Sequence, residues 1–265
     1  FLRAVIRGLE SENEPLNRKK LLDYLELGFW SLLEEADRKK FAVPIEELLW
    51  SKVDPNASTT LDVEAKSAYF KSLIRVFTSE SMVQKLYEIW KTQREIGDLK
   101  LSELDVVQLG YELAVRLPEE SQLILELLGK RIENPDRQLR HQFVAPSLSA
   151  DKEIRDQFFG LLKNPKNRRP ERWVLEAVSL LHHPLRANQA VGYVLPSLEL
   201  MEDIQATGDI FFPKRWMVAT LSGHRSKEVA ETIVQFLNKR PNYSVRLRRK
   251  ILQAADLLLR INGIN

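Results

Sequence analysis

The four histidines of the chain are its first candidates for metal ligands, because the chain has no cysteine. A helix-borne zinc hydrolase site needs two histidines four residues apart, with a glutamate beside the first to activate water. His182 and His183 are adjacent and would point about 100° apart on a helix, while His141 and His224 stand alone. We therefore predict no metal site in this chain, and we interpret the histidines as capping or packing residues.

Other catalytic patterns are also missing from the sequence. The glycines are isolated from one another and form no phosphate-cradling loop, and no Gly-x-Ser-x-Gly nucleophile turn occurs. The pairs Glu34-Glu35, Glu46-Glu47 and Glu119-Glu120 are typical of solvated helix edges or of first-turn acids that a helix dipole favours. We expect no catalytic centre in the chain itself. An all-helical enzyme of other chemistry would need titratable groups gathered in a pocket.

Positive charge is unevenly distributed along the chain. Residues 1–133 carry 19 Lys and Arg against 24 Asp and Glu, a net charge of −5, whereas residues 134–265 carry 21 against 13, a net charge of +8. One interpretation is a surface that meets an anionic or carboxylate-bearing partner, and the other is cations scattered over solvated helix faces. Acids interrupt every basic run, which argues against a nucleic-acid interface.

A local cluster of Arg168, Arg169 and Arg172 lies at a predicted helix start. Positive charge at that end opposes the helix dipole. This placement indicates a partner for the cluster, either an acidic side chain from elsewhere in the fold or a bound anion.

Helices must position these residues, because apolar residues recur at three- and four-residue steps and no sustained two-residue alternation occurs. The clearest stripes predict helices over residues 61–76, 106–117, 173–181, 229–237 and 247–258. The fold class is therefore all-α. No apolar run approaches the ~20 residues that a membrane-spanning helix needs. The lack of cysteine fits either a reducing or an oxidising compartment, so the localisation stays open.

Helix-start signals indicate a repeat of two helices. Ser102 with Asp105 can form a capping box, Asn134 precedes a first-turn proline, and we predict that Pro118, Pro170 and Pro213 are further first-turn prolines. The distances between every second start are 42, 33, 35 and 43 residues, for starts at Thr60, Ser102, Pro135, Pro170 and Pro213. These steps are typical of HEAT- and armadillo-like helical hairpins. We predict a single domain over residues 1–265 that forms an irregular α-α superhelix.

Six segments occur in a particular order along the chain. They are Asn134-Pro135-Asp136, Arg155-Asp156 before Phe158-Phe159, Glu171-Arg172-Trp173-Val174, His182-His183-Pro184-Leu185-Arg186, Thr207-Gly208-Asp209-Ile210-Phe211-Phe212-Pro213-Lys214-Arg215-Trp216, and Ile251-Leu252-Gln253-Ala254-Ala255-Asp256. From about residue 60 to its end, the chain resembles the C-terminal helical region of zinc aminopeptidases of the aminopeptidase N type, particularly the large bacterial members.

The resemblance implies that catalysis and coverage of the active site belong to different domains. In that family the amino-terminal part holds a β-rich domain and a thermolysin-like catalytic domain with the zinc motif, and the C-terminal helical region covers the active site as a bowl of hairpins. This chain has no zinc motif, so the resemblance implies no cofactor within it and places zinc in a catalytic domain that is absent. The chain opens without a methionine and in mid-pattern, and we expect it to be part of a longer metallopeptidase.

The segment of residues 207–216 allows two interpretations. In the structural one, Gly208 ends the preceding helix as a left-handed cap, while Phe211, Phe212 and Trp216 are buried anchors. In the functional one, polar side chains of the segment project toward the catalytic domain or the peptide chamber.

Candidate contact residues follow from the functional interpretation and from the basic half. They are Asp209, Lys214, Arg215, Arg186, Arg246 and Arg249, which we expect to contact peptide substrate or the protein's own catalytic domain. The run from His182 to Arg186 is also predicted to close one hairpin and open the next, with a histidine satisfying helix-end carbonyls.

The rival hypothesis is an independent helical-repeat scaffold whose concave face binds an acidic peptide or protein partner. A His-Glu-x-x-His motif encoded upstream of Phe1 would favour the aminopeptidase, and a start codon beside Phe1 would favour the scaffold. Residues 1–60 have the weakest resemblance. An exposed apolar patch there would indicate a neighbour that covers it.

Overall fold

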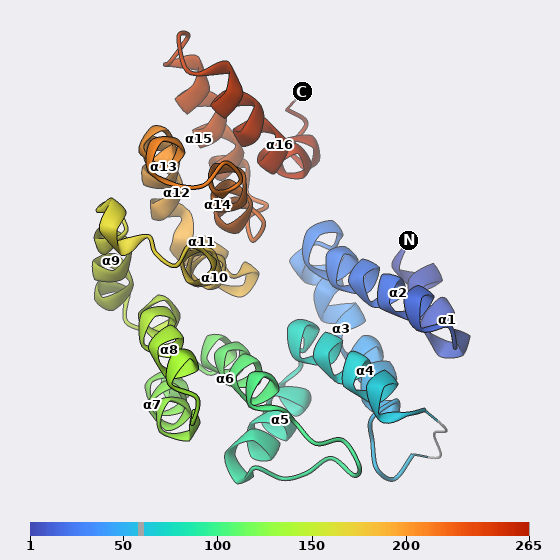
Figure 1. Cartoon of the computed structure of the whole chain (residues 1–265). Coiled ribbons are helices and arrows are strands. Elements are labelled where there is room, and N and C mark those ends of the chain that lie inside the picture. Colours follow the sequence, from blue (N-terminus) through green and yellow to red (C-terminus); the bar gives the residue numbers. More distant parts are fainter. Residues whose placement is uncertain (58–60, 265) are drawn as a thin grey trace. The chain divides into compact units, whose positions relative to one another are not determined.

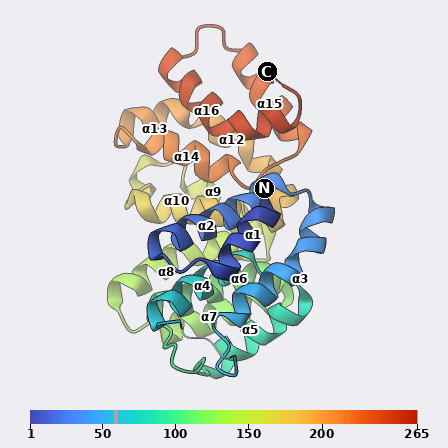
Figure 2. The same cartoon turned by 90° about the vertical axis from the view of Figure 1, so that its right-hand side faces the viewer.

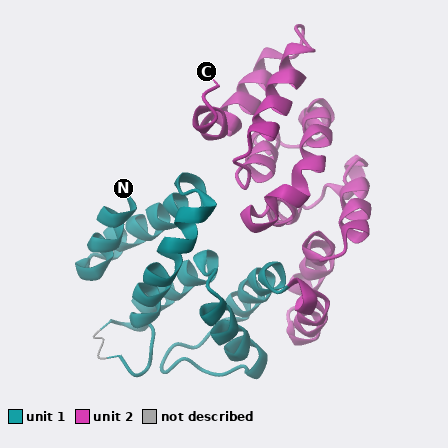
Figure 3. Ribbon diagram, turned by 180° about the vertical axis from the view of Figure 1, so that it is seen from behind, with its two compact units in different colours: residues 1–117 teal, residues 118–265 magenta. Residues whose placement is uncertain are grey.

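The computed structural model describes residues 1–57 and 61–264, and the chain divides into two compact units, Phe1–Leu117 and Pro118–Asn265 (Figure 1 and Figure 3). Both units consist of helices joined by turns, and the prediction of an all-α chain of helical hairpins is confirmed. In the described part of the chain, β pairing is limited to one bridge between Ile96 and Leu99. None of the helices in that part is long and apolar enough to cross a membrane.

The first unit stacks its helices in pairs. Its elements are α1 Leu2–Ser11, α2 Pro15–Leu27, the π-helical turn η1 Gly28–Leu32, α3 Glu35–Ser51, α4 Val63–Val76, α5 Glu80–Thr92 and α6 Glu103–Arg116. Helix α1 packs against α2, α3 against α4, and α5 against α6; Figure 2 shows α1 and α2 side by side. Contacts of α4 with both α2 and α6 place alternate helices in one layer.

The second unit repeats this arrangement with more short helices. Its elements are η2 Pro118–Glu120, α7 Ser121–Arg131, α8 Pro135–Leu148, α9 Lys152–Leu161, η3 Pro165–Asn167, α10 Glu171–Leu181, η4 Pro184–Arg186, α11 Ala187–Ala190, η5 Val191–Tyr193, α12 Val194–Glu199, α13 Met201–Thr207, α14 Phe212–Leu221, α15 Lys227–Asn238 and α16 Val245–Ile261. Helices α8, α10, α14 and α16 contact one another in succession and form one layer, and α12 packs against α15.

The predicted two-helix repeat agrees with these layers. Ser102 is the N-cap of α6, Pro135 is the first residue of α8, and Pro213 lies in the first turn of α14. Thr60 lies outside the described residues, and the helix that follows it begins at Val63. The long step before α14 arises because η4, α11, η5, α12 and α13 are inserted between α10 and α14.

Helix caps follow the sequence signals in most places. The capping box of Ser102 and Asp105 is complete, and the Asn134 side chain accepts a hydrogen bond from the backbone N–H of Arg137. Pro118 opens η2, directly before α7. Pro170 is the N-cap residue of α10 rather than a residue of its first turn, so the prediction is wrong by one position. A proline cannot accept hydrogen bonds through its side chain, and α10 has no side-chain cap.

Glu46 departs from its predicted place at a solvated helix edge, since it is buried in the first unit. Its carboxylate accepts hydrogen bonds from the backbone N–H groups of Thr78 and Ser79, at 2.6 and 2.9 Å. These residues precede α5, whose N-terminal dipole favours a negative charge. The pattern of α3 could not show this, because the partner groups come from another helix.

Candidate functional site

The corner between α13 and α14 contains three of the predicted contact residues, and Asp209 shapes it. The Asp209 carboxylate accepts hydrogen bonds from the backbone N–H groups of Phe211 and Phe212, at 2.6 and 3.0 Å. A short acidic side chain that binds backbone N–H groups two and three residues ahead stabilises the entry to a helix. Asp209 is therefore engaged in building the corner, whichever partner the corner contacts.

Gly208 ends α13, as predicted, but not through a left-handed conformation. Its backbone is extended, with φ −99° and ψ 178°. A Cβ atom at this position would lie 2.5 Å from Cδ1 of Phe212 and 2.9 Å from the carbonyl oxygen of Ile204. Glycine is needed here because the next helix packs closely against the end of α13, not because of a positive φ angle.

Two of the three predicted anchors are buried. Phe212 and Trp216 lie in the core with their rings 6.2 Å apart, and the indole N–H of Trp216 donates to the carbonyl oxygen of Ser197. Phe211, by contrast, is 61% exposed, and its neighbour Ile210 is 66% exposed. The prediction of a buried Phe211 is wrong, because Phe211 precedes α14, whose buried face begins with Phe212 and Pro213.

Side chains at the start of α10 and on α16 hold the corner in place. The backbone N–H of Asp209 donates to the Glu171 carboxylate at 3.0 Å, and the Arg169 guanidinium donates to the carbonyl oxygen of Thr207 at 3.0 Å. From α16, the Lys250 ammonium donates to the carbonyl oxygen of Ile210 at 3.2 Å and to the side chain of Gln205 at 2.8 Å. The corner is thus a fixed support rather than a loose loop.

The exposed side of the corner combines apolar and positively charged groups. We call Ile210, Phe211, Lys214 and Arg215 the corner surface. Lys214 and Arg215 are exposed in the first turn of α14, and the Arg215 guanidinium lies over the Phe211 ring at 5.8 Å from its centre. An apolar tip flanked by two cations is suited to a protein or peptide surface that offers apolar contacts beside carboxylates.

Arg246 and Arg249 lie exposed near the start of α16, the helix that packs against α14. Lys250 links this region to the corner surface, because its ammonium reaches Ile210. Burial, and then the positive charge of Arg246, lower the pKa of Lys250. Arg246 therefore lies close enough to add to the positive potential of the corner. The sequence signal for Lys250 was its shared face with the two arginines.

Arg186 occupies a different environment from the other predicted contact residues. It is 5% exposed, and its guanidinium donates to the carbonyl oxygen of Leu148 at 2.6 Å, at the end of α8. Arg155 also binds this helix end, through the carbonyl oxygens of Ser149 and Ala150. Burial, and then the charge of Arg155, lower the pKa of Arg186 to about 10. Because Arg186 is used inside the fold, we do not include it in the contact surface proposed below.

The cluster before α10 finds a partner within the fold. Arg168 is buried and forms an ion pair with Asp203 of α13, and it also donates to the Thr207 hydroxyl. The expected acidic side chain from elsewhere in the fold is confirmed for this residue. Arg169 pairs with Glu171 at 3.3 Å, and Arg172 is exposed.

The four histidines act mainly inside the second unit. His182 and His224 form a buried hydrogen bond of 2.8 Å between Nδ1 and Nε2, although they are far apart in the sequence. The His183 ring accepts a hydrogen bond from the backbone N–H of Leu185, and His141 contacts the carbonyl oxygen of Leu125 at 3.0 Å. The segment from His182 to Arg186 closes α10 and opens η4, as predicted. His183, however, caps the start of η4 and does not bind carbonyl groups at the end of a helix.

An exposed apolar face also occurs in the first unit. Such a face is expected if a neighbouring domain covers it. Leu16, Tyr24 and Leu27 of α2 are exposed at helical spacing, with Leu16 at 77%, and the ring of the exposed Phe1 packs on that of Tyr24. We call these four residues the α2 surface. Exposed apolar residues that gather on one face mark a candidate contact site.

No group of three or more His, Cys, Asp or Glu side chains in the described part of the chain could hold a metal ion. The sequence matches no protein-family model, and it matches no curated protein.

Proposed function

We propose that this chain is the non-catalytic C-terminal domain of a zinc aminopeptidase, where it covers the active site, shapes the peptide chamber and supports the catalytic domain. The observation that carries the proposal is the corner surface. It lies in the longest of the segments that resemble the family, it is held by Arg169, Glu171 and Lys250, and it still exposes Phe211 and Ile210 to solvent.

A fixed aromatic tip is expensive to leave in water. Full burial of a Phe or Ile side chain contributes about 1.5–3 kcal/mol, and this gain is realised only when a partner covers the tip. The adjacent cations favour a partner that brings carboxylates, such as a peptide's C-terminus or an acidic edge of a catalytic domain. The corner surface is therefore better explained as a contact than as an accident of packing.

The α2 surface supports the same proposal from the other unit. Leu16, Tyr24, Leu27 and Phe1 expose apolar side chains in the segment where a neighbour was expected. In the full-length enzyme, a neighbouring domain packed against this face would remove it from water.

Catalysis itself is assigned to the missing domain. In such an enzyme, the zinc ion activates the water that hydrolyses the peptide bond. The described residues of this chain include no group of three side chains that could hold the ion. In the proposal, this chain's residues instead bind, orient and restrict the peptide substrate.

Substitutions in the full-length polypeptide test the proposal. We expect Lys214→Ala and Arg215→Ala to raise the KM for long peptides while leaving hydrolysis of dipeptides nearly unchanged, because only a long peptide reaches the covering domain. The matched control is Lys239→Ala, an exposed cation at the end of α15. If both variants match the unchanged enzyme on long and short peptides, the corner surface has no role in substrate access.

The second candidate function is an independent scaffold that binds an acidic partner, and the exposed cations Lys214, Arg215, Arg246 and Arg249 favour it. The two functions differ in the gene that encodes the chain. An upstream His-Glu-x-x-His motif in the same reading frame supports the aminopeptidase, and a start codon beside Phe1 supports the scaffold.

A further inference from the structure

A groove between α8 and α9 opens on the second unit, away from the residues used above for the corner surface. It has a volume of about 460 Å³, within the range of roughly 300–1,000 Å³ that small-molecule sites occupy. Its lining residues are Gln142, Phe143, Pro146, Ile154, Gln157, Phe158, Leu161, Leu162, Lys166, Asn167 and Arg169.

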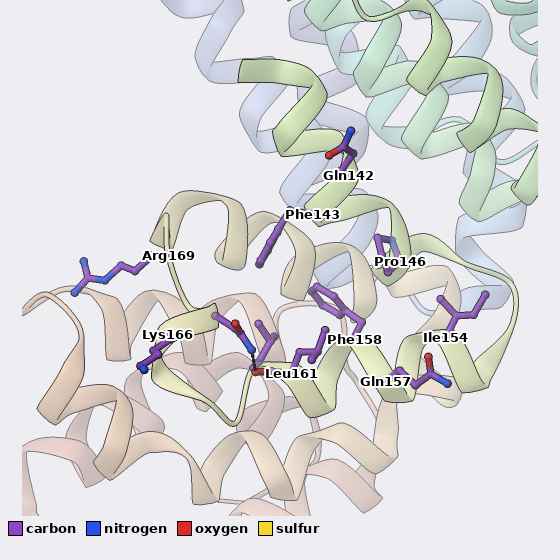
Figure 4. Close-up of a pocket in the computed structure, with 11 residues that line it drawn as sticks. Gln142, Phe143, Pro146, Ile154, Gln157, Phe158, Leu161, Lys166 and Arg169 are labelled. Atoms are coloured by element: carbon purple, nitrogen blue, oxygen red, sulfur yellow. Dashed lines mark hydrogen bonds between the residues drawn. The ribbon is translucent and has the colours of Figure 1, made fainter. Parts of the chain in front are cut away.

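Polarity changes along the groove, as Figure 4 shows. Lys166 and Arg169 lie at one end, Phe143 and Phe158 form the middle, and Ile154 and the uncharged Gln157 lie at the other end. The two phenylalanine rings are 5.8 Å apart and meet edge to face. No acidic side chain lines the groove. The site is therefore complementary to an elongated molecule with an anionic head and an apolar body.

Hydrogen bonds and an ion pair fix the backbone and side chains at the cationic end of the groove. The Asn167 side chain donates to the carbonyl oxygen of Leu161 at 3.0 Å and fastens the η3 segment to the end of α9. Arg169 is held by Glu171 and by the carbonyl oxygen of Thr207. Glu171 partly neutralises Arg169, so Lys166, whose ammonium has no ion-pair partner in the described part of the chain, supplies the available charge.

The walls of the groove favour an alkyl carboxylate over the C-terminus of an extended peptide. Most of them are side chains of α8 and α9, where most backbone groups are bonded within the helices; the carbonyl group of Gln142 is an exception, because Pro146 has no N–H to donate to it. An extended peptide laid over Phe143 and Phe158 would lose most of its hydrogen bonds to water without replacement, which is costly. An alkyl chain has no such groups to lose, and its burial is favourable.

We propose that this groove binds an aliphatic monocarboxylate of the fatty-acid type. The carboxylate lies beside Lys166 and Arg169, and the alkyl chain lies over Phe143 and Phe158 toward Ile154. This site is separate from the corner surface and the α2 surface, although Arg169 also donates to the carbonyl oxygen of Thr207 and so helps to hold the corner.

Calorimetric titration of the whole chain with octanoate tests the proposal. We expect saturable binding of octanoate and weaker binding of octylammonium, which has the same alkyl chain and the opposite charge. Methyl resonances of Ile154 and Leu161 should shift on addition of octanoate. A capped tripeptide that ends in a free leucine carboxylate serves as the peptide probe, and it should not displace octanoate.

Charge reversal at the head of the groove gives the matched pair of variants. Lys166→Glu should weaken octanoate binding by about tenfold, because it replaces an attraction with a repulsion beside the carboxylate. Lys163→Glu changes an exposed lysine of the same connection that does not line the groove, and its affinity should stay within about twofold. Both lysines are exposed, so both variants should fold.

Four results would overturn the proposal. The first two are no saturable binding of octanoate to the unchanged chain and an affinity in Lys166→Glu equal to that of the unchanged chain. The other two are octylammonium binding as tight as that of octanoate and displacement of octanoate by the tripeptide. The last result would instead identify the groove as a site for a peptide's C-terminus.

Discussion

At Gly208, the residue type is set by space and not by backbone conformation. Its φ and ψ angles are extended and open to any residue, yet the ring of Phe212 and the carbonyl oxygen of Ile204 occupy the place of a Cβ atom. The sequence pattern marked a helix end correctly and predicted the wrong reason for it. A glycine after a helix is compatible with either cause, and only the neighbouring helix decides between them.

Gly208→Ala should therefore destabilise the second unit. The added methyl group must push the Phe212 ring aside, and such overpacking costs about 1–3 kcal/mol. Urea unfolding followed by circular dichroism measures the loss. Gly160→Ala is the control, because its Cβ meets nothing within 4 Å, and it should leave the unfolding free energy unchanged or slightly higher. Equal stability of the two variants would contradict the close packing at Gly208.

The His182–His224 pair is a residue-scale feature with a consequence for pH. Burial lowers the pKa of His224 to about 4, and burial followed by the charge of His224 lowers the pKa of His182 well below its usual value. Both rings stay neutral in the folded chain, whereas in the unfolded chain they gain protons below about pH 6.5. Acidification through this window therefore favours unfolding.

We expect the unfolding free energy to fall by about 1 kcal/mol per histidine between pH 7 and pH 5.5, because the unfolded state binds more protons there. The measurement is urea unfolding at a series of pH values. His224→Gln should remove part of this slope. A free energy that is constant or rises toward pH 5.5 would show that the pair is not buried and neutral.

At the scale of the elements, helix ends are satisfied by charged side chains from other helices. Glu46 of α3 binds the N–H groups that open α5, and Arg186 and Arg155 bind the carbonyl groups that close α8. Each charge has the sign that the helix dipole favours. Caps within one helix could be predicted from the sequence, as at Ser102 and Asn134, but these caps could not.

Arg186→Met tests whether that arginine is structural. Removing the guanidinium leaves the buried carbonyl group of Leu148 with only the longer hydrogen bond of 3.3 Å from the Ser121 hydroxyl, and this loss costs about 1–3 kcal/mol. Thermal and urea unfolding should both show the loss. Arg246→Met, at an exposed position of α16, should change stability by less than about 0.5 kcal/mol. An Arg186 variant as stable as the Arg246 variant would return Arg186 to the candidate contact residues.

Periodicity predicted the helices well because each buries one apolar stripe, but it did not predict which loop residues face water. The sequence pattern does not distinguish Phe211 from its neighbour Phe212. Only the packing of α14 shows that Phe212 is buried and Phe211 is exposed. The histidine pair lay beyond sequence reasoning for another reason, since the fold joins two loops that are far apart in the chain. The short helices before α14 also escaped prediction, because they are too brief to show a stripe.

For the whole molecule, the count of Lys and Arg in residues 134–265 overstates the positive charge that reaches the surface. Arg155, Arg168 and Arg186 are buried and bound within the fold, so they contribute little to the outer surface. What remains near the corner is a small set of exposed cations beside an aromatic tip. This favours a defined contact with one partner over a broad attraction to polyanions.

We propose that the chain belongs to a zinc aminopeptidase and serves as its covering domain. The most direct test isolates the native polypeptide with an antibody raised against this chain, then measures its bound zinc and its hydrolysis of an alanine anilide. The account predicts one zinc ion per polypeptide and hydrolysis that a chelator abolishes. A native polypeptide without zinc and without aminopeptidase activity would contradict it.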